Sequence, residues 1–107
     1  MTASQIELDE LPGVISVPGQ VLFTRRCVQD IAMTFGIDAD SEDIDDLHAT
    51  AIEGFGAVCD LRDSLEESRP EDPMRLPRWE AIIDALNGIS YLLHNGRTHD
   101  GKLIRFV

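Results

Sequence analysis

Apolar side chains recur with a helical period in three stretches of the chain. In the first, they repeat every three or four residues from Gln20 to Phe35, and Gly36 follows as a residue suited to end a helix. In the last, Pro77 suits the first turn of a helix that continues to about His94 and stops at Asn95-Gly96. These patterns predict helices over 20–35 and 77–94.

The middle stretch predicts a longer helix, over about 42–68. Asp40 or Ser41 can cap its N-terminus, and the acidic residues that follow complement the positive end of the helix dipole. An apolar stripe then continues through Phe55 to Leu65, and we expect Phe55, like Phe35 of the first helix, to lie in the core. Two glycines, Gly54 and Gly56, interrupt the stretch, and we expect a kink or a close helix contact there.

Two short segments rich in β-branched residues, one before the first predicted helix and one after the last, predict strands. Residues 13–17 are followed by the turn dipeptide Pro18-Gly19, and residues 103–107 follow Asp100-Gly101. We expect the two strands to pair with each other. The predicted fold is therefore mainly α: a three-helix domain with a long second helix, plus a small two-stranded ribbon formed by the chain ends. Residues 1–12 are expected to be a flexible acidic arm and residues 13–107 a single helical domain.

Composition narrows the classes of function. The 107 residues include nine Lys and Arg against twenty Asp and Glu, a formal charge of −11. Such a chain is not expected to bind nucleic acid through its phosphates or an anionic membrane surface. No run of eighteen apolar residues is present, and the acidic start lacks the basic residues of a secretory signal. Cys27 and Cys59 are then expected to be reduced thiols in a cytoplasmic protein, with a structural disulfide as the alternative.

Carboxylates recur every seven residues along the predicted second helix. They lie opposite its apolar stripe, and two further acids flank them; the set is Asp45, Asp46, Glu53, Asp60, Asp63 and Glu67. A solvated helix face usually mixes both signs of charge, whereas a face of one sign repels itself and attracts cationic surfaces. The row therefore predicts docking onto a basic protein surface, with simple solubility as the alternative.

The third predicted helix has a second face of mostly small residues. Its members are Ala81, Ala85, Gly88 and Leu92. Small side chains allow close approach of helix axes. Either another helix of the same chain packs there or a second copy does, which would form a homodimer.

The sequence contains few motifs that are typical of metal-binding or catalytic sites. His94 and His99 flank a short segment followed by Asp100, a weak candidate for a transition-metal site. The acidic run from Asp38 fails as a calcium loop because Asp43 replaces the required glycine. No nucleophile elbow, phosphate loop or dinucleotide fingerprint is present. We expect no catalytic residues and no cofactor.

These observations favour a non-catalytic, acidic protein-interaction domain. It would be an inhibitor or regulator that docks on a basic protein surface, imitating the charge of nucleic acid. In charge and size, though in no motif, the chain is similar to phage-encoded inhibitors of defence nucleases, antitoxins and secretion chaperones. The alternatives are a homo-oligomeric structural or adaptor module, and a small metal-binding protein or enzyme that uses His94 and His99.

Overall fold

The described part of the chain opens with a β-hairpin. The computed structural model describes residues 13–107, so the predicted arm at 1–12 lies outside the described residues. β1 (Val14–Val17) and β2 (Gln20–Phe23) pair antiparallel across Pro18-Gly19. Gly19 has a φ of +79°, which costs glycine little. The prediction of a helix from Gln20 is therefore wrong at its start.

The third strand completes a mixed sheet. β3 (Leu103–Phe106) pairs in parallel with β2, so the strand order is β1-β2-β3. The predicted ribbon, in which the last segment pairs with residues 14–17, is wrong. The hairpin places β2 beside β1, and β3 then takes the other edge of β2.

The first helix begins one residue after β2. α1 (Arg25–Thr34) has Thr24 as its N-cap residue, in an extended conformation. The Thr24 hydroxyl donates a hydrogen bond to the Gly13 carbonyl over 2.6 Å. A Cβ at Gly13 would lie 2.5 Å from Cβ of Arg26, so only glycine fits there. The start of β1 is thus held against the start of α1.

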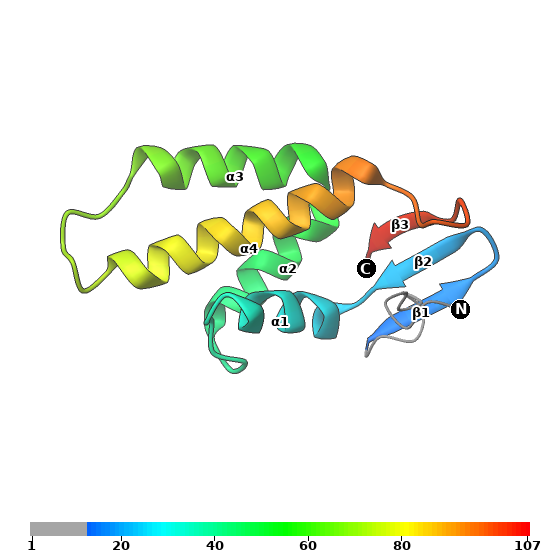
Figure 1. Ribbon diagram of the computed structural model, residues 1–107, viewed down its shortest axis with the longest axis horizontal. Helices are drawn as coiled ribbons and strands as arrows, with labels where there is room; N and C mark the ends of the chain where they lie inside the picture. Colours follow the sequence, from blue (N-terminus) through cyan, green and yellow to red (C-terminus); the bar gives the residue numbers. More distant parts are fainter. Residues whose placement is uncertain (1–12) are drawn as a thin grey trace.

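The predicted long second helix is two helices. α2 (Glu42–Glu53) and α3 (Phe55–Glu67) meet at Gly54, whose φ of 111° and ψ of −173° lie outside the range open to other residues. The predicted capping is confirmed, because the Ser41 hydroxyl accepts a hydrogen bond from the Asp43 amide at 3.2 Å. Figure 1 shows that α2 and α3 run in different directions.

The last helix forms as the periodicity predicts. α4 (Leu76–Asn95) ends at Gly96, which is left-handed at φ 63° and donates its amide proton to the Leu92 carbonyl at 3.0 Å. Its buried residues lie on more than one face, because α1 and α3 both pack on it. α3 and α4 lie side by side in Figure 1.

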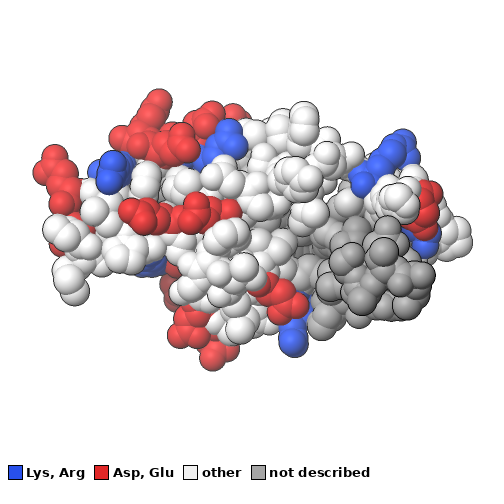
Figure 2. All heavy atoms as spheres, in the orientation of Figure 1, with Lys and Arg blue, Asp and Glu red and all other residues white. Residues whose placement is uncertain are grey.

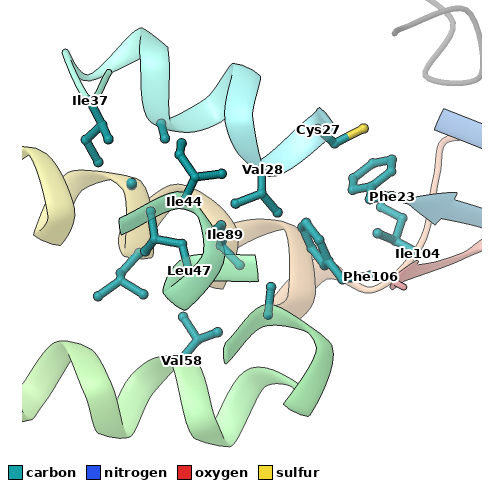
Figure 3. Close-up of a cluster of buried hydrophobic side chains, with 14 of the residues drawn as sticks. Phe23, Cys27, Val28, Ile37, Ile44, Leu47, Val58, Ile89, Ile104 and Phe106 are labelled. Atoms are coloured by element: carbon teal, nitrogen blue, oxygen red, sulfur yellow. The ribbon is translucent and has the colours of Figure 1, made fainter. Parts of the chain in front are cut away.

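Residues 13–107 therefore contain four helices and a three-stranded mixed sheet, so the predicted three-helix domain with a two-stranded ribbon is wrong. The core runs from the inner face of the sheet into the helices (Figure 3). Phe23 and Phe106 meet edge-to-face there, with ring centroids 5.3 Å apart. Phe35 and Phe55, which the periodicity places in the core, are 39% and 42% exposed. No helix within residues 13–107 has the length and apolarity needed to cross a membrane.

Candidate interaction surface

The six acidic residues of the predicted row are all exposed, but they do not form one line. Asp46 and Glu53 lie on α2, whereas Asp60, Asp63 and Glu67 lie on α3 beyond the break at Gly54. Within α3, the spacing of three and four residues places these three carboxylates on one face. The single row of carboxylates predicted along one helix is therefore two separate groups, one on α2 and one on α3.

Some carboxylates of α2 are engaged within the fold. Asp45 accepts a hydrogen bond from Nε of Arg25 on α1 at 2.7 Å. Asp43 accepts two from Arg78 on α4, at 2.9 and 2.7 Å, and its side chain is only 13% exposed. These hydrogen bonds outweigh the effect of burial and lower the pKa of Asp43. Asp43 and Asp45 therefore link α2 to its neighbouring helices.

Four carboxylates of the set have no such partner. Within residues 13–107, no basic side chain forms an ion pair with Asp46, Glu53, Asp60 or Glu67. Asp63 belongs to neither group, because its carboxylate lies 3.5 Å from Nη2 of Arg62, its neighbour in the chain. The structure thus divides the acidic residues of α2 and α3 into those that join helices and those that remain available to solvent or to a partner.

The unpaired carboxylates of α3 lie on a helix that is firmly attached to α4. The Trp79 indole donates to the Leu65 carbonyl at 2.7 Å, and Nη1 of Arg62 donates to Oδ1 of Asn87 at 3.3 Å. Sγ of Cys59 lies 3.8 Å from Oγ of the buried Ser90. Arg62, the basic residue within α3, is therefore drawn toward α4. The exposed face of α3 keeps its acidic residues, and acidic side chains gather over this end of the molecule in Figure 2.

An exposed aromatic residue stands at the beginning of the same helix. Phe55 is 42% exposed, and its ring centroid lies 5.4 Å from that of His94 at the end of α4. Ile52, at the end of α2, is 50% exposed. Figure 2 shows few charged side chains where α3 begins and α4 ends. The periodicity predicts a buried Phe55 because it continues the apolar stripe of the second helix across Gly54, where the chain changes direction.

The small-residue face of α4 lies within the fold. Ala85 is completely buried and Ala81 is 8% exposed, whereas Leu92 is half-buried against the core. At Gly88 an added Cβ would lie 3.5 Å from Ile31 and 3.6 Å from Phe35, both from the α1 region. The face was predicted to pack either against another helix of the same chain or against a second copy. In the structure it packs against a helix of the same chain.

The weak metal candidates do not come together as a site. The His94 ring lies tilted against that of Phe55, and His99 is an exposed turn residue. Within residues 13–107, no three His, Cys, Asp or Glu side chains are grouped so that they could hold a metal ion. Burial raises the pKa of the Cys27 thiol. A raised pKa favours the protonated thiol, as expected of a core residue, over the thiolate that acts as a nucleophile.

No known protein family, curated protein or solved structure shows significant similarity to this chain.

Proposed function

We propose that this protein is a non-catalytic interaction module of the cytoplasm that docks on a basic protein surface, as an inhibitor or regulator. The docking surface consists of the unpaired carboxylates on α3 and α2, namely Asp46, Glu53, Asp60 and Glu67. The supporting observation is that these four residues are exposed without an ion-pair partner among residues 13–107 and lie on two helices, α2 and α3, that pack against each other, whereas Asp43 and Asp45 are bound to arginines.

A surface of unpaired carboxylates has an electrostatic cost. Carboxylates of one sign on neighbouring turns repel one another, and a nearby arginine would relieve this repulsion. The fold instead directs Arg25 and Arg78 to other carboxylates and Arg62 toward α4. A surface that keeps its negative potential raises the association rate with a cationic partner and disfavours acidic ones.

Phe55 supplies a contact of a different kind. Interfaces draw most of their affinity from a few well-buried side chains, often aromatic, while charges at the rim set orientation and association rate. Phe55 is exposed at the beginning of α3, the helix that carries Asp60 and Glu67. We infer that it is the apolar anchor of the docking surface.

The test compares two variants with the same change of net charge. One variant neutralises the docking surface (D46N/E53Q/D60N/E67Q). The matched control neutralises four exposed acids elsewhere (D40N/E71Q/E80Q/D84N). Wild-type protein and both variants are immobilised and exposed to host-cell extract over a range of salt concentrations. We expect the wild type and the control to retain the same basic protein at low salt and the docking-surface variant to lose it. Equal retention by both variants would reject the proposed surface.

A second measurement addresses imitation of nucleic acid. Once the retained basic protein is purified, duplex DNA is added as a competitor in a binding assay. If the acidic surface occupies a nucleic-acid site, DNA and the module compete, and both interactions weaken with salt. Simultaneous binding of both would reject imitation of nucleic acid while leaving the docking proposal standing.

A further inference from the structure

The outer edge of β1 presents backbone groups that no described residue uses. The Thr24 amide donates to the Gly13 carbonyl at 3.1 Å, so the backbone groups of Gly13 face β2. The hydrogen-bonding direction alternates along an antiparallel strand, so Ile15 and Val17 also face β2. The N–H and C=O groups of Val14 and Ser16 then point away from the sheet. Within residues 13–107, nothing pairs with this edge.

This edge also lacks the usual protection against pairing. Natural edge strands commonly carry charged residues that prevent association with another strand. Residues 13–24 contain no charged side chain, although 27% of the whole chain is charged. Ile15, in the middle of β1, is 50% exposed on the face of the sheet opposite the core. The edge therefore combines free backbone groups with an exposed apolar side chain.

We propose that β1 pairs antiparallel with β1 of a second copy of this chain, which joins two three-stranded sheets into one. The outward groups set the register: Val14 of one copy is opposite Ser16 of the other, and Ile15 lies on the two-fold axis opposite itself. Each Val14–Ser16 pair exchanges two backbone hydrogen bonds, so the junction has four. Ile15 and its symmetry mate form a non-hydrogen-bonded pair, in which the side chains lie closest.

The charge distribution favours a second copy as the occupant. Residues 25–96 hold sixteen acidic and six basic side chains, whereas residues 97–107 hold one acidic and three basic. Figure 1 shows β1 at the opposite end of the molecule from α3 and the 68–75 loop. Within residues 13–107, Lys102 brings a positive charge to this strand, because its ammonium donates to the Ser16 hydroxyl at 2.7 Å. Pairing through β1 therefore joins two acidic chains at strands that carry no acidic side chain, and it keeps α3 and the 68–75 loop of the two copies apart. Asp60 and Glu67, the part of the docking surface on α3, stay accessible in both copies.

The size of the junction determines its strength. Stable protein interfaces bury about 1,200–2,000 Å² in total. Two four-residue strands contribute only part of such an area, so the dimer dissociates on dilution. The test therefore measures mass as a function of concentration rather than at one concentration.

Sedimentation equilibrium of the full chain is the first experiment. We expect the wild-type mass to rise with concentration from 11.9 kDa toward twice that value. Ile15→Lys places like charges opposite each other on the two-fold axis, and this variant should remain at 11.9 kDa throughout. Leu103→Lys is the matched control, because Leu103 is 43% exposed on the same sheet face but belongs to β3; it should associate like the wild type. Circular dichroism checks that both variants fold.

Cross-linking tests the register separately. Cα atoms of a non-hydrogen-bonded pair are about 4.5 Å apart, which a disulfide can span. Ile15→Cys should therefore form a covalent dimer under mild oxidation, whereas Val17→Cys, on the same strand and face, should form little. The unaltered chain, with its Cys27 and Cys59, serves as the blank. A wild type that stays monomeric at every concentration, a dimer that persists in Ile15→Lys, or equal cross-linking of the two cysteine variants would overturn the proposal.

Discussion

Arg78 of α4 holds the Asp43 carboxylate of α2 through two parallel hydrogen bonds, from Nε at 2.9 Å and from Nη2 at 2.7 Å. This bidentate geometry is the strongest form of an arginine–carboxylate contact. Arg78 is itself 71% exposed, so solvent screens the pair. The same Asp43 donates its amide proton to the capping Ser41, so one residue joins the start of α2 both to its cap and to α4.

Removing this carboxylate should make stability less dependent on pH. The hydrogen bonds from Arg78 lower the pKa of Asp43, so the ionised group stabilises the fold. This stabilisation is fully present above about pH 4, the ordinary pKa of Asp, and is lost as the pH falls below it. Asp43→Asn should lower the free energy of unfolding by about 1 kcal/mol at pH 7. Urea unfolding at several pH values measures the effect, and the difference from wild type should vanish in acid. Asp46→Asn, without an ion pair, is the control and should change little.

The two glycines between α2 and α3 should respond in opposite directions to alanine. Gly54 has a φ of 111° that alanine adopts only with strain, so Gly54→Ala should cost about 1–3 kcal/mol. Gly56 lies within α3, and an added Cβ would meet no atom within 4 Å. Gly56→Ala should therefore stabilise the protein by about 0.5–1 kcal/mol. Both changes are measured by urea unfolding. Equal effects of the two substitutions would show that Gly54 does not require its left-handed backbone.

The small-residue face of α4 should not tolerate charge. Ala85 is fully buried, so Ala85→Glu introduces both volume and an unpaired carboxylate and should cost about 2–4 kcal/mol. Ala49→Glu, at an exposed position of α2, is the control and should shift stability by less than about 0.5 kcal/mol. Thermal unfolding compares the two. An unchanged melting temperature for Ala85→Glu would contradict the packing of α4 against the other helices.

The contact between the indole of Trp79 and the end of α3 should be measurable on its own. Trp79→Phe removes the donor to the Leu65 carbonyl and should cost about 1 kcal/mol or somewhat more. The guanidinium of Arg69 lies 5.7 Å from the same ring, so Arg69→Ala is the control that removes only the cation–π contact. The exposed Arg69 should contribute less than the hydrogen bond. Circular dichroism follows unfolding of both variants, because Trp79→Phe has no tryptophan fluorescence.

Several elements follow from local sequence alone. The span of α4 is set by a long apolar period and ends at Gly96, and Ser41 caps α2, because these signals act within a few residues of one another. The β1 segment is likewise marked by β-branched residues and the Pro18-Gly19 turn. The acidic character of the surface and the exposure of Asp46, Glu53, Asp60 and Glu67 also follow from composition and helical spacing.

Tertiary structure decided the rest, because the deciding contacts join residues far apart in the chain. The four residues Gln20–Phe23 fit a strand or a helix, and they form β2 because β1 and β3 provide hydrogen-bonding partners on both edges. Asp43 and Asp45 look no different from Asp46 in sequence. Arg78 is 35 positions from Asp43, and Arg25 is 20 positions from Asp45. Only the packing of α1 and α4 against α2 determines which carboxylates are paired, and therefore which ones remain to meet a partner.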